Sequence, residues 1–243
     1  MIDSSKRKLI KAISWKFLGF ITLSVLTYVV TGDLKTVGLI GVVYHVAMTA
    51  LYLFHEKAWE RVLWGKTRGL SIQMTGLSGS GKTTIARLVQ QRLRKKGLQV
   101  EVIDGDEYRA GICQDLGFSK EDRNTNIKRL GFVSKVLARN GVISIISAIN
   151  PYDEVRKELN QLEDNFKTVY ISCDLKTLKQ RDTKGLYRKA LLPDGHPEKI
   201  YNFTGISDPF EEPINPDLMI NTSNEDIEHS SYKLENFILK AIS

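Results

Sequence analysis

The segment Gly76-Leu77-Ser78-Gly79-Ser80-Gly81-Lys82-Thr83 constrains the fold more than any other part of this 243-residue chain. It has the spacing GxxxxGK[ST], it follows an apolar run over residues 70–75, and a helical pattern begins at Thr84. Glycines let consecutive backbone N–H groups turn inward around phosphate oxygens, and a helix start adds partial positive charge at the same point. The segment is therefore predicted to bind the phosphates of a nucleotide at the end of a strand.

The side chains of this loop fit ATP with Mg²⁺. The ammonium group of Lys82 is predicted to reach the β- and γ-phosphates, and the hydroxyl of Thr83 to ligate Mg²⁺. The alternative, a glycine-rich turn without function, is disfavoured because the strand–loop–helix context is also present. The predicted nucleotide-binding residues are Gly76, Leu77, Ser78, Gly79, Ser80, Gly81, Lys82, Thr83 and Thr84.

Four further apolar runs are predicted strands, at residues 98–103, 141–147, 168–172 and 218–222, and residues 226–242 are a predicted closing helix. Helical patterns alternate with these runs. Such alternation is typical of an α/β fold, here a P-loop NTPase-type parallel sheet with helices on both faces. We assign this kinase domain to residues 67–243.

The second predicted strand ends in Asp104-Gly105-Asp106. Ligands of open parallel sheets bind beyond the carboxyl ends of the strands, so these carboxylates are predicted to lie beside the phosphate loop. There they would organise Mg²⁺ or take the proton from an attacking hydroxyl. A plain acidic turn is the alternative.

A cluster of Arg, Asn and Phe side chains follows. Ser119 is predicted to cap a helix that carries Arg123, Asn126 and Arg129. Together with Arg109 and Phe118, these residues suit an anionic aromatic ligand, because Arg pairs with phosphate or sulfate and Phe stacks on a base. An ordinary solvated helix is the alternative. The basic segment 178–189 is predicted to close over the phosphates as a lid.

Two apolar runs near the N-terminus, about residues 10–30 and 36–54, are each long enough to cross a bilayer. Residues 1–70 hold ten basic and four acidic side chains, whereas the remainder holds 25 and 24. This distribution argues against nucleic-acid binding by the main domain and favours a transmembrane helical hairpin, residues 1–66, with both termini in the cytoplasm. Because a charged side chain, Lys16, lies inside the first run, a buried helical hairpin in a soluble protein is the alternative interpretation.

The motifs Gly76–Thr83, Asp104-Gly105-Asp106, Phe118–Arg129, Lys184-Gly185-Leu186-Tyr187 and Phe203-Thr204-Gly205-Ile206 together resemble the adenylylsulfate kinase family, over about residues 70–240. The resemblance implies transfer of the ATP γ-phosphoryl group to the 3′-hydroxyl of adenylylsulfate, and it leaves a homodimer open. The N-terminal segment resembles a small two-helix membrane-domain family of unknown function. This implies attachment of the kinase to the inner (cytoplasmic) membrane.

The resemblance also implies roles for individual residues. Lys82, Asp104, Asp106 and Lys184 would be catalytic, and Arg181 would join the nucleotide-binding set. The acceptor would contact Asp104, Arg109, Phe118, Arg123, Asn126, Arg129, Ile149, Lys184 and Phe203, with its adenine between Phe118 and Phe203.

The chain departs from the family in three places: two residues of the family pattern Ser-Pro-Tyr-Arg and the length of one loop. Asn150 replaces the serine, so a phosphoserine intermediate is not expected here, and Asp153 replaces the arginine. The segment 191–202 is longer than usual and lacks the usual lysine before Phe203. These departures keep two alternatives open: a related kinase with another nucleotide-like or small phosphorylated acceptor, and a nucleotide-sensing membrane protein without turnover.

Overall fold

The computed structural model describes residues 5–30, 37–62, 69–162, 165–182 and 184–242. The chain divides into two compact units, one of residues 2–66 and one of residues 67–243. Each unit is described by itself below.

The larger unit contains a five-stranded parallel sheet with the strand order β2-β3-β1-β4-β5. The strands are β1 (Leu70–Thr75), β2 (Val100–Asp104), β3 (Ile143–Ser147), β4 (Phe166–Ser172) and β5 (Leu218–Asn221). All residues of β1 and β3 are buried, as expected for inner strands that are covered on both faces. The parallel α/β fold predicted from the alternating pattern is confirmed.

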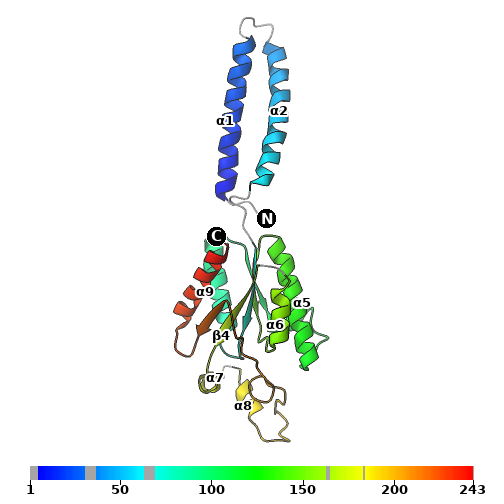
Figure 1. Ribbon diagram of the computed structural model, residues 1–243, viewed down its shortest axis with the longest axis vertical. Coiled ribbons are helices and arrows are strands. Elements are labelled where there is room, and N and C mark those ends of the chain that lie inside the picture. Colours follow the sequence, from blue (N-terminus) through cyan, green and yellow to red (C-terminus); the bar gives the residue numbers. More distant parts are fainter. Residues whose placement is uncertain (1–4, 31–36, 63–68, 163–164, 183, 243) are drawn as a thin grey trace. The chain divides into compact units, whose positions relative to one another are not determined.

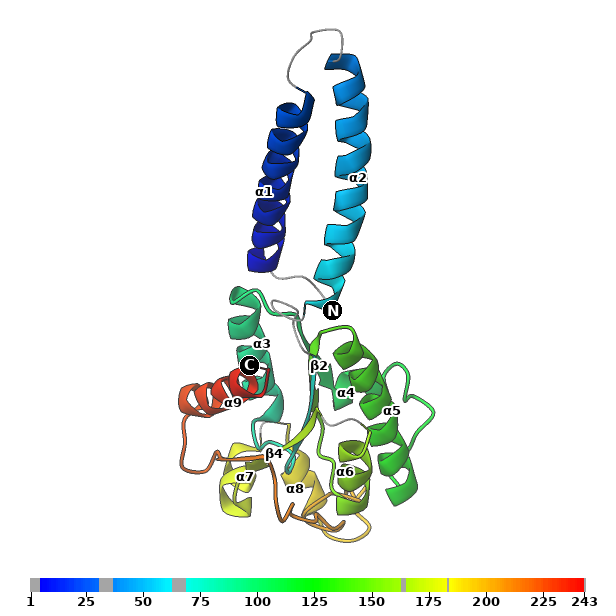
Figure 2. The same ribbon diagram turned by 45° about the horizontal axis from the view of Figure 1, so that its top comes forward.

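Helices cover both faces of this sheet (Figures 1 and 2). On one face, α3 (Lys82–Lys95) and α9 (Ile227–Ile242) enclose an apolar core with side chains such as Ile72 and Ile145. On the other face, α5 (Lys120–Arg139) and α6 (Asp153–Asn160) pack over Ile103 and Ile146. Because strand side chains alternate between faces, Ile145 and Ile146 belong to different cores.

Three short helices lie near the carboxyl ends of the strands: α4 (Gly105–Arg109), α7 (Leu175–Arg181) and α8 (Leu186–Ala190). A third apolar cluster, which includes Leu178 and Tyr187, holds α7 and α8 together. These helices had no clear periodic signal, since five to seven residues are too few to show one. The predicted cap of α5 is confirmed, because Ser119 Oγ accepts a hydrogen bond from the Asp122 N–H at 3.1 Å.

The smaller unit contains two helices, α1 (Ser5–Val30) and α2 (Val37–Arg61). Polar contacts join them at one end. Lys11 pairs with Glu56 at 2.6 Å, and His55 Nε2 lies 2.9 Å from Ser14 Oγ. A Cβ added at Gly19 would lie 2.9 Å from Met48 Cε, so the flexible Met48 side chain of α2 packs against this glycine of α1.

Over the described part of the chain, no helix combines the length and apolarity that a membrane crossing requires. The transmembrane hairpin therefore stays a prediction. The sequence also predicts a polar turn at residues 31–35 between the two apolar runs and basic residues beyond the second run, among them Lys66 and Arg68. The turn, these two residues and the side chain of His45 in the second run lie outside the described residues.

Candidate active site

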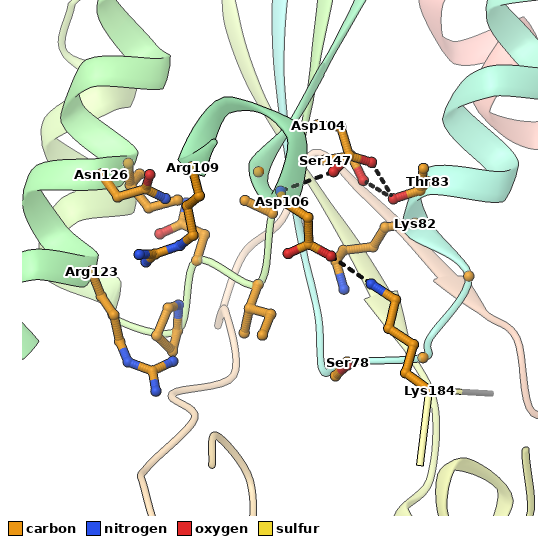
Figure 3. A pocket seen from close by; sticks show the side chains of 18 of the residues that line it. Ser78, Lys82, Thr83, Asp104, Asp106, Arg109, Arg123, Asn126, Ser147 and Lys184 are labelled. Carbon is orange, nitrogen blue, oxygen red and sulfur yellow. Dashed lines mark hydrogen bonds and ion pairs between the residues drawn. The ribbon is translucent and has the colours of Figure 1, made fainter. Parts of the chain in front are cut away.

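A cavity of about 300 Å³ opens at the carboxyl ends of β1, β2 and β3 (Figure 3). It has the location predicted for the ligand of an open parallel sheet. Its lining comes from the phosphate loop, from α4, from α5 and from the segment after β3. The lining residues are Ser78, Gly79, Gly81, Lys82, Thr83, Thr84, Asp104, Gly105, Asp106, Arg109, Phe118, Arg123, Asn126, Ile127, Ser147, Ala148, Ile149, Asn150, Pro151 and Lys184.

Two glycines give the phosphate loop its path. Gly76 has a φ of 150°, and a Cβ there would lie 2.3 Å from the carbonyl oxygen of Ile171. Gly81 has a φ of 94° and precedes the first residue of α3. A left-handed residue at this point turns the chain so that the N-terminus of α3 faces the cavity, where the helix dipole favours an anion.

Lys82 is buried, and its ammonium group donates to the carbonyl oxygens of Gly76 and Leu77, both at 2.8 Å. Burial lowers the pKa of Lys82 to about 8, although the negative charge of Asp106 works in the opposite direction. A buried ammonium whose hydrogen bonds go to neutral carbonyl oxygens favours an incoming anion. Lys82 is thus positioned to receive a phosphate group.

Thr83, Asp104 and Ser147 bring three side-chain oxygens together. Thr83 Oγ1 donates to Asp104 Oδ2 at 2.9 Å and lies 2.9 Å from Ser147 Oγ (Figure 3). Asp104 Oδ1 also accepts from the backbone N–H of Asp106 at 2.9 Å, which caps α4. Asp104 is therefore held in one orientation by both its neighbours in sequence and the phosphate loop.

Asp106 and Lys184 form an ion pair across the cavity mouth, with Asp106 Oδ2 and Lys184 Nζ 2.5 Å apart (Figure 3). Both side chains are exposed, at 75% and 63%. An exposed ion pair contributes little to the stability of the protein. Unlike Asp104, Asp106 can therefore release Lys184 and bind a ligand instead.

Arginine and aromatic groups gather at the other end of the cavity. The Arg109 guanidinium lies 4.6 Å from the centroid of the Phe118 ring. Phe118 is 61% exposed, which leaves its ring available to a ligand. Arg123 is buried and donates to Thr204 Oγ1 at 2.6 Å, which fixes its orientation. Asn126 is also buried, and its Oδ1 has no hydrogen-bond partner among the residues that the structure describes.

Some predicted site residues lie outside this cavity lining. Arg129 pairs with Asp115 at 2.5 Å on the surface of the domain. Phe203 is buried and packs edge-on against Tyr187, with ring centroids 4.9 Å apart. Arg181 donates to the backbone oxygen of Thr222 at 2.6 Å. Of the phosphate loop, Gly76, Leu77 and Ser80 shape the backbone without lining the cavity.

The structure adds cavity residues that were not predicted, among them Ser147 and Asn150. Both lie at or just after the carboxyl end of β3, and the available signal was that the carboxyl ends of all strands of a parallel sheet meet at one edge. The departure at Asp153 lies outside the cavity lining, and its carboxylate pairs with Lys157 at 2.7 Å. The longer segment 191–202 carries its own ion pair, Lys199 to Asp194 at 2.5 Å.

Two protein families match separate parts of the chain. The family described as "Adenylylsulphate kinase" matches residues 68–221. The family described as "Predicted membrane protein (DUF2061)" matches residues 9–60. The adenylyl-sulfate kinase of Rippkaea orientalis is 47% identical over 169 residues, which cover 70% of this chain and 91% of that protein.

Solved structures agree with this similarity. The APS (adenylylsulfate) kinase CysC of Mycobacterium tuberculosis, solved in complex with AMPPNP and APS, is 36% identical, with a TM-score of 0.66 over 71% of this chain and 98% of that one. The hexameric APS kinase of Thiobacillus denitrificans is 26% identical, with a TM-score of 0.54 over 72% of this chain and 29% of that one.

Proposed function

Because the chain belongs to the adenylylsulfate kinase family, we infer that it transfers the γ-phosphoryl group of ATP to the 3′-hydroxyl of adenylylsulfate. The product is 3′-phosphoadenylylsulfate, so the enzyme takes part in sulfate assimilation. One observation of the site carries this inference. A single cavity holds the phosphate loop at one end and the Arg109, Phe118 and Arg123 group at the other, with Asp106 and Lys184 also in its lining.

This arrangement suits an in-line transfer between two anions. The phosphate-loop end, with Lys82 and the start of α3, favours a triphosphate. The opposite end offers two guanidinium groups for a phosphosulfate and an exposed ring for a purine. Phosphoryl transfer needs mainly positioning and charge stabilisation, and both ends supply them.

The residues fit a magnesium ion bound together with the nucleotide. Beside the phosphate loop, the Thr83 hydroxyl lies 2.9 Å from both the Asp104 carboxylate and the Ser147 hydroxyl. Mg²⁺ prefers oxygen ligands and is usually held by one or two protein groups, water and substrate phosphates. We propose that Thr83 holds the ion directly and that Asp104 orients it. When bound, the ion would neutralise charge that develops on the phosphates.

We further propose that Asp106 is the group that orients the 3′-hydroxyl and accepts its proton. Asp104 already accepts hydrogen bonds from Thr83 and from two backbone N–H groups, whereas among the described residues the Asp106 carboxylate contacts only the exposed Lys184. When a hydroxyl approaches Asp106, Lys184 is released to pair with the transferred phosphoryl group. The transfer breaks the bond between the γ-phosphorus and the bridging oxygen of ATP and forms the new 3′-O–P bond.

Steady-state kinetics of the 243-residue chain test this function. We expect ADP release that depends on adenylylsulfate, ATP and Mg²⁺, with 3′-phosphoadenylylsulfate as the product. Asp106→Asn is expected to lower kcat by about 10²–10⁴-fold, the usual worth of a general base. Asp115→Asn is the matched control, since Asp115 is another exposed, paired carboxylate, and it lies outside the cavity lining. Absence of adenylylsulfate-dependent ADP release from the unmodified chain would refute the substrate.

Residues 1–66 are proposed to anchor the kinase domain, residues 67–243, to the cytoplasmic face of the inner membrane. The match to a membrane-protein family over residues 9–60 supports this. So do the exposed apolar side chains of the helix pair, such as Phe17 (64%), Leu53 (63%) and Phe54 (73%). Retention of the chain in membranes after an alkaline carbonate wash is expected, and its recovery in the wash would contradict the anchor. Homo-oligomer formation, in particular the homodimer, stays a prediction.

A further inference from the structure

The buried Tyr187 connects two segments of the kinase domain that lie far apart in the sequence. Its hydroxyl donates a hydrogen bond to the backbone carbonyl oxygen of Ser78, at 2.8 Å. Ser78 belongs to the phosphate loop, whereas Tyr187 lies on the short helix α8. Only 2% of the Tyr187 surface is exposed, and the residue is not part of the cavity lining. Through this hydrogen bond, Tyr187 can influence a ligand without touching it.

Several contacts hold Tyr187 in place. Its backbone N–H donates to Asp182 Oδ1 at 3.0 Å, at the start of α8. Its ring packs edge-on against Phe203, with ring centroids 4.9 Å apart, in the third apolar cluster. Burial raises the pKa of the Tyr187 hydroxyl above its ordinary value, so the hydroxyl keeps its proton at neutral pH. Tyr187 therefore presents a fixed, neutral donor to the phosphate loop.

The direction of the Ser78 carbonyl also sets the direction of the Gly79 N–H, because both belong to one planar peptide unit. In a trans peptide the C=O and N–H bonds point in opposite directions. A donor that holds the Ser78 oxygen therefore directs the Gly79 N–H away from Tyr187. Gly79 has a φ of 75° and lines the cavity. Since glycine adopts many conformations at similar cost, this peptide unit would rotate easily without the hydrogen bond from Tyr187.

Other carbonyl groups of the phosphate loop are also held by side-chain donors. The ammonium group of Lys82 donates to the carbonyl oxygens of the two residues before Ser78, and Thr222 Oγ1 donates to Ser80 O at 3.0 Å. A loop that binds anions with its N–H groups needs donors for its carbonyl oxygens. Lys82 lines the cavity and is placed to bind the ligand itself. Tyr187 acts on the ligand only through the loop.

We propose that Tyr187 is a positioning residue for nucleotide binding. Its hydroxyl fixes the peptide unit between Ser78 and Gly79, so that the Gly79 N–H donates to a phosphate oxygen of ATP. The assignment rests on the proposed function, because it takes ATP as the ligand of the phosphate loop. It does not depend on the identity of the acceptor.

Two variants of the full chain separate positioning from stability. Tyr187→Phe removes the hydroxyl and retains the ring that packs against Phe203. It is expected to raise the KM for ATP about tenfold, because the loop is then ordered only when the phosphates bind. The KM for adenylylsulfate is expected to stay within about twofold.

Tyr170→Phe is the matched control. Tyr170 is another buried tyrosine, with 7% of its surface exposed, and it lies on β4 outside the cavity lining. This variant is expected to change neither KM, whatever its effect on the Tm. If Tyr187→Phe leaves the KM for ATP unchanged, or raises the KM of both substrates equally, the assignment is overturned.

Inorganic tripolyphosphate with Mg²⁺ shows which part of the nucleotide is affected. It carries the phosphates of ATP without the adenosine, so it is used as a competitor of ATP. Its inhibition constant is expected to rise about tenfold in Tyr187→Phe, by the same factor as the KM for ATP. A rise in the KM for ATP with an unchanged inhibition constant would locate the effect at the adenosine and overturn the assignment.

Calorimetric titration with ADP and Mg²⁺ distinguishes this assignment from the function on which it rests, since it needs no acceptor. If the unmodified chain binds no adenine nucleotide, the proposed function and the assignment both fail. If it binds ADP but does not phosphorylate adenylylsulfate, the function fails, and the assignment stands only if Tyr187→Phe binds ADP about tenfold more weakly. If it phosphorylates adenylylsulfate and Tyr187→Phe binds ADP equally well, only the assignment fails.

Discussion

Binding of ATP is expected to take up a proton at alkaline pH, because of the burial of Lys82. The pKa of this lysine falls from an ordinary 10.5 to about 8, chiefly through desolvation. This difference corresponds to about 3 kcal/mol of differential stabilisation between the two protonation states. A bound triphosphate supplies the anionic partner that the free site lacks, so it raises the pKa of Lys82 towards or above its ordinary value.

The sign of the effect follows from proton counts. Between pH 8 and 10.5 the unfolded chain keeps the proton on Lys82 while the folded, ligand-free chain has lost it. This residue therefore makes folding more favourable as the pH rises through that window. When the nucleotide binds, Lys82 takes its proton back. At pH 9 about 0.9 proton is expected to be taken up for each nucleotide bound, and at pH 7 only about 0.1.

Isothermal titration calorimetry in two buffers with different ionisation enthalpies measures this uptake directly. The adenine nucleotide is titrated with Mg²⁺ at pH 7 and at pH 9, where its phosphates are already ionised. Lys184→Met serves as a comparison, since it removes the exposed lysine of the cavity and retains Lys82. The uptake at pH 9 should persist in that variant. Equal proton uptake at both pH values in the unmodified chain would show that Lys82 is not the titrating group, and the reasoning would fail.

Three further changes test other parts of the site. Thr83→Val is expected to lower kcat/KM by about 10²–10³-fold and Thr83→Ser by far less, since only serine keeps the hydroxyl; a Mg²⁺ titration of the rate checks this. Gly76→Ala is expected to cost more than about 3 kcal/mol, because its Cβ would lie 2.3 Å from Ile171 O; the shift in Tm measures it. Arg123→Lys is expected to raise the KM for adenylylsulfate about 10–100-fold with the KM for ATP unchanged, since Lys cannot reproduce the guanidinium contacts; equal changes in both would contradict its place at the acceptor end.

The position of the phosphate loop at the end of β1 could be predicted from the sequence, because its geometry is local. Backbone dihedrals over eight consecutive residues place Lys82 and Thr83, and a single loop spacing records them. The positions of Asp104 and Asp106 were also predictable, because the carboxyl ends of all strands of a parallel sheet meet at one edge. No tertiary contact had to be known for either inference.

The acceptor end was predicted less completely, since helix geometry alone does not say which side chain meets a partner. Arg123 and Asn126 both line the cavity, but Arg129 does not. An offset of six residues corresponds to about 600° of rotation, which leaves Arg129 about 120° from Arg123 around α5. At that angle Arg129 forms an ion pair with Asp115, which lies in the loop before α5. Phe203 was placed beside the acceptor by resemblance, whereas here it packs against Tyr187 in the third apolar cluster.

Asn150 marks the limit of inference from the sequence. In the sequence it is a lone amide before a proline, and nothing near it indicates a direction for its side chain. Its orientation depends on Gln73, 77 positions earlier, and on Thr168, which lies on another strand. A polar network of this kind has no period and no motif, so the sequence alone does not indicate how its side chains are oriented. The side chain of Asn150 is thus oriented by the layer behind the cavity wall, through one amide on β1.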